Sequence, residues 1–332
     1  NSLKVVFFVI FISLHLDGLK SSLFSFILGE DVAVLLRCVK IREFTGDKLS
    51  FKDDLSHTEK EQFIKYSLTV ALIAGIGVLL QNVNMIMLEK LLGADSVAVY
   101  KVAHNYVALI GVLISPFIAF WPVISKLYKE NKISEIQAEM RNIVKIVTYM
   151  VIPMFLIFYF LSEKLLFIFG KGYVTDDGKK VLLILGFAFL VDAISGPIGS
   201  ILNMTKYAKF TLINNIIAVL LNIILNYVFI RKYGVAGAAI GTGISIIANN
   251  LISIVEVKLL LGIFSYDYKY VIQIVSFSIG NYFLSRWLFG ILNINNSFIY
   301  IVVFGIIIYV INMLVIAFIY RQLIIDKFIK KR

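Results

Sequence analysis

The stretch Asn214–Ser245 reads NNIIAVLLNIILNYVFIRKYGVAGAAIGTGIS and decides the fold of this chain. Almost every position is apolar or small, yet four asparagines fall in its first half. On a helix Asn215, Asn222 and Asn226 lie within about 40° of one another, whereas Asn214 lies off that stripe. An amide in hydrocarbon costs free energy unless it finds hydrogen-bond partners, so the stripe faces something other than lipid tails. It either lines a hydrated cavity or joins helices to one another.

The second half of this stretch carries small residues at helical spacing. Gly237 and Gly241 lie four residues apart, and Gly234 precedes them. Small residues at this spacing let two helix backbones approach closely in a bilayer, and a glycine between two apolar runs favours a turn. We therefore predict a tightly packed antiparallel helix pair with Gly237 and Gly241 at its contact. This packing favours the helix-joining role for the asparagine stripe.

The whole chain is strongly apolar. Of its 332 residues, 60% are hydrophobic and 16% are charged, and the mean hydropathy is +0.90. Apolar blocks of about 20 residues, long enough to cross a hydrocarbon core of ~30 Å, recur along it. They predict an all-α polytopic membrane protein with spans near 66–89, 98–125, 142–162, 181–203, 210–230, 236–257, 270–289 and 298–320. Two shorter apolar runs, near 3–16 and 22–36, precede these spans.

The chain has a net charge of +11, and the distribution of its basic residues along the sequence is explained by membrane insertion. If the loop 37–65 is cytoplasmic and the later spans alternate, 21 of the 32 Lys and Arg lie on the cytoplasmic side and nine on the other. Basic loops of membrane proteins are retained in the cytoplasm. The bias therefore predicts a cytoplasmic C-terminus and an outward-facing segment 163–180. It also accounts for the basic charge without a nucleic-acid partner.

The longest polar break, within 39–65, separates two groups of helices. We expect 1–42 to be the remnant of an N-terminal helical lobe and 43–65 to be a cytoplasmic linker between lobes. The remaining predicted domains are a six-helix transmembrane lobe over 66–262, and two further transmembrane helices with a basic cytoplasmic tail over 263–332.

The segment 126–145 places Ile and Met at helical spacing among Lys, Glu and Gln. This pattern is typical of a helix that lies along the inner membrane surface. A plain solvated connector is the alternative.

No catalytic motif is present in the sequence. The three histidines are far apart, and no Cys/His cluster has metal-ligand spacing. The stretch GYVTDDGKK resembles a phosphate-binding loop, but five residues rather than four separate its glycines, and a lysine replaces the Ser/Thr. The sequence thus predicts no catalytic residue, no metal and no cofactor.

Polar side chains within the predicted spans are the candidate functional residues, because they are costly in a bilayer. Asp192, near the middle of its span, could meet a buried cation, carry a mobile proton, or bond a neighbouring helix for packing alone. Lys101 also fits an interfacial anchor whose ammonium group reaches the lipid headgroups. The candidates for a hydrated substrate path are Asp192, Gln81, Asn84, Lys101, His104, Asn105 and Asn249.

Two strings resemble the oligosaccharide (O-antigen) flippase family of the multidrug/oligosaccharidyl-lipid/polysaccharide exporter superfamily. LLGADSVAVYKVAHNYVALIGVLISPFIAFWPVISKLYKE matches a helix pair of that family through Gly93, Tyr100, Pro122 and Ser125. ILNMTKYAKFTLINNIIAVLLNIILNYVFIRKYGVAGAAIGTGIS matches a second pattern, an Asn-rich helix followed by Tyr-Gly-x-x-Gly-Ala-Ala. Its matching residues are Asn203, Lys206, Asn215, Asn222, Asn226, Tyr233, Gly234, Gly237, Ala238 and Ala239. The chain departs from the family at Asn84, where many relatives carry an acid.

The resemblance implies a C-terminal helical lobe plus two extra helices of a two-lobe exporter fold, with the N-terminal lobe truncated. It implies translocation of polyprenyl-diphosphate-linked oligosaccharide across the bacterial cytoplasmic membrane, with membrane lipids and polysaccharide polymerase machinery as partners. Two alternatives stay open. An aromatic cavity with one dominant carboxylate would favour a cation-coupled multidrug exporter of the same superfamily, and a large outer loop or a catalytic His/Asp pair would favour a membrane-embedded polymerase or acyltransferase.

Overall fold

A computed structural model describes residues 28, 32, 36, 39, 56–264, 266, 268–291, 302–314 and 317. The regular elements among these residues are all helical. The chain divides into two compact units, Asn1–Ile64 and Lys65–Arg332, and the packing described below lies within the second. The expected lobe remnant 1–42 falls almost wholly outside the described residues, and the four-domain division stays a prediction.

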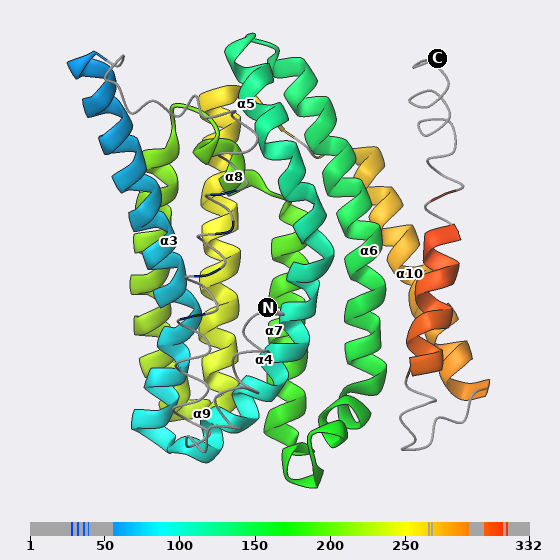
Figure 1. Ribbon diagram of the computed structural model, residues 1–332. Coiled ribbons are helices and arrows are strands. Elements are labelled where there is room, and N and C mark those ends of the chain that lie inside the picture. Colours follow the sequence, from blue (N-terminus) through cyan, green and yellow to red (C-terminus); the bar gives the residue numbers. More distant parts are fainter. Residues whose placement is uncertain are drawn as a thin grey trace. The chain divides into compact units, whose positions relative to one another are not determined.

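Figure 1 shows the helices of the second unit. Helix α7 packs against α4, α6 and α9, while α10 packs on α6 and α8 packs on α9. The bounds are α3 His57–Leu92, α4 Ala94–Ile114, η1 Ser115–Phe120, α5 Trp121–Lys129, α6 Ile133–Ile168, η2 Lys171–Tyr173, α7 Asp176–Ser195, α8 Ile198–Asn203, α9 Ala208–Leu261 and α10 Tyr268–Ile291. A shorter apolar helix spans Val302–Leu314.

Several of these helices are suited to cross a membrane. In the described part, four are long and apolar enough: Thr58–Leu92, Ala94–Lys129, Ile133–Ile168 and Ala208–Leu261. Large apolar side chains lie on their outer faces, such as Val112 and Leu259, which are 63% and 78% exposed. Such a surface requires an apolar solvent. The predicted all-α, multi-pass membrane protein is thereby confirmed.

Helix α3 begins inside the segment that the sequence assigns to a linker. Its first turn is closed by a capping box, in which the Ser56 backbone N–H donates to Glu59 Oε2 at 2.8 Å and the Glu59 N–H donates to Ser56 Oγ at 3.3 Å. These two bonds satisfy backbone groups that a helix start leaves open. Hydropathy places the start near 66 because it detects only the apolar part of a helix, and α3 continues into charged sequence.

Helix α9 is two helices joined at a sharp kink. Gly234 adopts φ 60° and ψ −139°, a conformation that glycine reaches without strain. A Cβ atom on Gly237 would overlap the Phe229 carbonyl, and one on Gly241 would overlap Asn226. The two halves therefore fold back on each other as the antiparallel α9 hairpin, visible as adjacent columns in Figure 1.

The predicted span 181–203 is not continuous. Helix α7 ends at Ser195, Gly196 takes φ 75° and ψ −177°, and α8 starts only after Pro197. The Tyr266 hydroxyl donates to the carbonyls of Ile194 and Ser195 at 3.2 and 2.8 Å, so it supplies a partner for the open end of α7. The span predicted from hydropathy therefore contains a glycine–proline break, which hydropathy does not register.

The predicted surface helix 126–145 is also wrong. Helix α5 ends at Lys129, and α6 begins at Ile133 and runs without interruption to Ile168. The apolar positions Ile136, Met140 and Val144 are fully buried. They face neighbouring helices rather than lipid headgroups, because the first turns of α6 belong to the packed lobe.

Candidate functional site

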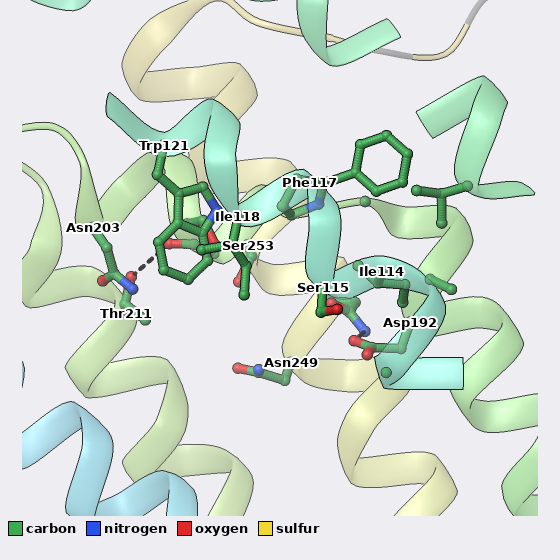
Figure 2. A pocket seen from close by; sticks show the side chains of 18 of the residues that line it. Ile114, Ser115, Phe117, Ile118, Trp121, Asp192, Asn203, Thr211, Asn249 and Ser253 are labelled. Carbon is green, nitrogen blue, oxygen red and sulfur yellow. Dashed lines mark hydrogen bonds between the residues drawn. The ribbon is translucent and has the colours of Figure 1, made fainter. Parts of the chain in front are cut away.

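A polar cavity of about 630 Å³ lies beside the break between α7 and α8. Its walls come from α4, η1, α7, α8 and both halves of α9, with one residue each from α3, α5 and α6. Figure 2 shows its side chains. Two irregular segments meet here, since η1 is a 3₁₀ helix with a proline in its first turn and α7 stops at Gly196. These interruptions separate backbones that would otherwise pack, and they leave room for a ligand.

Asp192 is the acidic residue among those that line the cavity. It comes from the last turn of α7, and its Oδ1 accepts a hydrogen bond of 2.7 Å from Asn250 Nδ2 on α9. One amide donor leaves most of the acceptor capacity of a carboxylate unused. Asp192 is thus held in position by α9 and remains able to accept bonds from a ligand.

The other polar groups of the cavity are uncharged. They are the amides of Asn203, Asn215, Asn249 and Asn250 and the hydroxyls of Ser115, Ser200, Thr211 and Ser253. No Lys, Arg or His stands among the described residues that line it. Asn203 Oδ1 and Asn249 Oδ1 are buried and have no hydrogen-bond partner in the described part of the chain. Buried acceptors without partners are costly, so a bound molecule with hydrogen-bond donors would stabilise this arrangement.

A second polar cluster lies outside the cavity, and its amides bond to one another, although Asn226 Oδ1 has no hydrogen-bond partner in the described part of the chain. Asn226 Nδ2 donates to Asn84 Oδ1 at 3.0 Å and to Asn222 Oδ1 at 2.8 Å. Asn84 Nδ2 donates to the Tyr100 hydroxyl at 3.0 Å. Thr242 joins the cluster because its hydroxyl lies 3.4 Å from that of Tyr100 and accepts from Asn222 Nδ2 at 3.5 Å. The members are at most 5% exposed. This amide network joins α3, α4 and both halves of α9.

Part of this helical unit matches a known protein family. The MatE family model matches residues 70–228, from α3 into the first half of α9. Residues 70–228 are therefore similar to the MatE family. This match, together with the relatives below, confirms the resemblance inferred from the sequence.

Two curated relatives are similar to this chain. The capsular polysaccharide biosynthesis protein CapF of Staphylococcus aureus is 27% identical over 208 residues, which are 62% of this chain and 51% of CapF. The probable low-salt glycan biosynthesis flippase Agl15 of Haloferax volcanii is 28% identical over 159 residues, 47% of this chain and 33% of Agl15. The chain thus spans about half of one relative and a third of the other.

One solved structure shares the fold. The lipid II flippase MurJ, in an inward closed conformation, has a TM-score of 0.67 and 20% sequence identity. The match covers 97% of this chain and 67% of MurJ. At this identity the likeness shows a common arrangement of helices.

The segment that matches the MatE model, residues 70–228, contains some residues of the cavity and some of the amide network. Asp192 and Asn215 lie within it and line the cavity, while Asn249 lines the cavity from beyond its end. The sequence groups Asn215 with the packing stripe, and the structure places it at the cavity. It groups Asn84 with the substrate path, and the structure places it in the amide network.

Of the remaining path candidates, Lys101, His104 and Asn105 are not among the residues that line the cavity. Lys101 and Asn105 are exposed on α4. His104 is half-buried, with its ring 6.1 Å from those of both Tyr100 and Phe189. Gln81 belongs to α3, and its side chain lies outside the described part of the structure.

Sequence reasoning missed two partners that define these clusters. Asn250 is adjacent to a predicted candidate but was not singled out, although it holds Asp192. Thr242 lies within the glycine run and was not singled out. Asn250 and Thr242 each lie on a helix face that contacts a candidate side chain on another helix. That face can be identified only when it is known which helices pack together.

Proposed function

We propose that this chain forms part of a transporter that moves polyprenyl-diphosphate-linked oligosaccharide repeat units across the bacterial cytoplasmic membrane, for O-antigen, capsule or exopolysaccharide synthesis. The observation that carries this proposal is a polar cavity of about 630 Å³ within an otherwise apolar helical unit. Transport requires no covalent step, so no residue is assigned a catalytic role and no cofactor is needed.

A saccharide cannot cross hydrocarbon unaided, because its hydroxyls would lose their hydrogen bonds to water. Amides and hydroxyls around a cavity replace those bonds, while the polyprenyl tail remains in the lipid. Helices that are interrupted at membrane depth are typical of transporter sites, and irregular backbone is tolerated there because it lines a cavity. The break after Ser195 fits that pattern. Access would alternate as this unit moves against the other half of a two-lobe transporter.

The names of the relatives support the same class of substrate. CapF is named for capsular polysaccharide biosynthesis and Agl15 as a probable glycan biosynthesis flippase. We assign the protein to the bacterial cytoplasmic membrane with its C-terminus in the cytoplasm, from the charge bias of its loops. Its proposed partners are the lipid-linked oligosaccharide, membrane lipids and the polysaccharide polymerase machinery.

A cation-coupled exporter of small amphiphiles is the second candidate. Asp192 is the acidic group among the described lining residues, and Phe117 and Trp121 line the same cavity. One carboxylate beside aromatic rings suits an organic cation. Four lining amides and the names of the relatives favour the saccharide instead.

Complementation tests the proposal. In a full-length version expressed in a flippase-deficient strain, the wild-type protein should restore surface glycan, and Asp192→Asn should insert normally yet restore little. Asp177→Asn, at the opposite end of α7, is the matched control and should behave as wild type. Resistance to cationic drugs without any restored glycan would favour the second candidate. Full glycan from the Asp192→Asn variant would assign Asp192 to packing.

A further inference from the structure

We infer that the cavity receives the sugar portion of the lipid-linked substrate and excludes its diphosphate. This inference rests on the proposed function and adds an orientation: the glycan lies against Asp192, while the diphosphate lies outside the cavity. Asp192, Asn203 and Asn249 are the residues that would determine it.

Charge argues against the diphosphate. Proteins hold phosphate groups with Arg or Lys, or with backbone N–H groups at the start of a long helix. The described lining of this cavity offers one carboxylate and no cation. An anion placed beside Asp192 would meet a like charge in surroundings of low dielectric constant, where repulsion is stronger than in water.

Hydrogen bonding argues for a polyol. Sugar hydroxyls both donate and accept, and side-chain amides do the same. Asn203 Oδ1 and Asn249 Oδ1 are buried acceptors without a partner among the described residues, and Asp192 accepts a single bond from Asn250. Several hydroxyl donors on one ligand would satisfy all three side chains. Phe117 and Trp121 add an apolar wall, the usual complement of a few polar groups in a small-molecule site.

The spread of these groups argues against a bare metal ion. A metal requires several oxygens that converge at about 2–2.6 Å from one point. In Figure 2, Asn203 and Thr211 lie at one side of the cavity, Asp192 and Ser115 lie at the other, and Asn249 lies between them. A volume of about 630 Å³ is that of a site for a small organic molecule.

Two probes with the same farnesyl diphosphate group, one of which carries a sugar on its terminal phosphate, test the inference. Farnesyl diphosphate and farnesyl diphosphate-linked N-acetylglucosamine are titrated against the purified full chain, and the ratio of their Kd values reports the contribution of the sugar. The wild-type chain should bind the sugar-bearing probe more tightly. Asp192→Asn should reduce this ratio about tenfold, as expected for the loss of a hydrogen bond to a charged group. Its affinity for farnesyl diphosphate alone should stay equal or rise, because a negative charge is removed.

Asn249→Leu should lower the same ratio, and Asp177→Asn should leave both affinities unchanged. A thermal unfolding midpoint close to that of the wild-type chain shows that a variant is folded. A ratio unaffected by both cavity variants would overturn the inference, as would a loss of farnesyl diphosphate binding in a folded Asp192→Asn chain. Stabilisation of the wild-type chain by Na⁺, lost in Asp192→Asn with an unchanged sugar ratio, would assign the cavity to a cation and also overturn it.

The proposed function is tested separately by glycan restoration. A protein that restores glycan but shows no Asp192-dependent sugar preference would retain the function and lose the orientation. A wild-type chain that restores no glycan and binds neither probe would contradict both.

Discussion

Asn214 and Asn215 are neighbours in the sequence, but their side chains lie in different environments. Asn214 is buried and its Nδ2 donates to Glu256 Oε2 at 2.5 Å across the α9 hairpin, whereas Asn215 lines the cavity. An ideal helical wheel places Asn215 on the face of Asn222 and Asn226. The buried face instead follows steps of four residues from Asn214 through Ala218 to Asn222 and Asn226. Such a ridge is what a crossing helix contacts.

The amide network should contribute to stability rather than to substrate binding. Asn222→Leu removes an acceptor from Asn226 and should lower the free energy of unfolding by about 0.6–2 kcal/mol, the range for interhelical hydrogen bonds in bilayers. Asn105→Leu, at an exposed position on α4, is the control and should change little. Thermal unfolding in detergent micelles measures both. A cysteine at position 222 that reacts rapidly with a water-soluble thiol reagent would instead place this side chain in water.

At the scale of the elements, the α7–α8 break positions the cavity. Gly196 has a backbone conformation that residues with a Cβ rarely adopt, and an added Cβ would overlap the Val144 side chain from α6. Two independent constraints, one of backbone and one of packing, therefore require glycine at this position.

Gly196→Ala should destabilise the protein by about 1–3 kcal/mol from backbone strain, with a further cost from the overlap with Val144. Adding Val144→Ala should recover only the overlap, so the double variant should cost less than the sum of the two single changes. Gly262→Ala is the comparison, because Gly262 also has positive φ but open space around it. Equal unfolding midpoints for Gly196→Ala and Gly262→Ala would show that the overlap with Val144 adds no cost.

The sequence predicted the apolar spans and the α9 hairpin for physical reasons. A span must be about 20 apolar residues long, and closely packed helices need small residues at their contact, so both properties are local. It favoured a helix-joining role for Asn222 and Asn226 but did not identify Asn84 as a partner, because Asn84 and Asn226 are 142 residues apart and only the packing of α3 brings them together. It also joined α7 and α8 into one span, since Gly196 and Pro197 interrupt a run whose hydropathy does not change.

For the molecule as a whole, the arrangement of charge predicts the orientation in the membrane. The segment between α6 and α7 contains η2, and Glu163 and Lys179 form an ion pair of 2.6 Å beside it. Thr175 is exposed and caps α7 by accepting a bond from the Gly178 N–H at 3.0 Å. We expect this segment to face outward because 21 basic residues fall on the opposite side and nine on this one.

Cysteine labelling in intact cells tests this orientation. In a Cys38→Ala background, Thr175→Cys should react with a membrane-impermeant maleimide, and Lys330→Cys should react only after the membrane is permeabilised. Loss of the Thr175 cap costs about 1 kcal/mol and should not prevent insertion. Labelling of position 330 but not 175 in intact cells would reverse the topology.

The amide network also implies an order of assembly during synthesis. Asn84 finds its first partner, Tyr100, only 16 residues later, in the next helix to leave the ribosome. Its side-chain carbonyl oxygen lacks its partner until Asn226 has been synthesised, 142 residues later. The α9 hairpin closes largely on its own, since Asn226 packs against Gly241 and Asn214 bonds to Glu256 of the other half. A nascent chain released before α9 is made therefore has an amide acceptor in the bilayer without its partner. Only the addition of α9 supplies that partner.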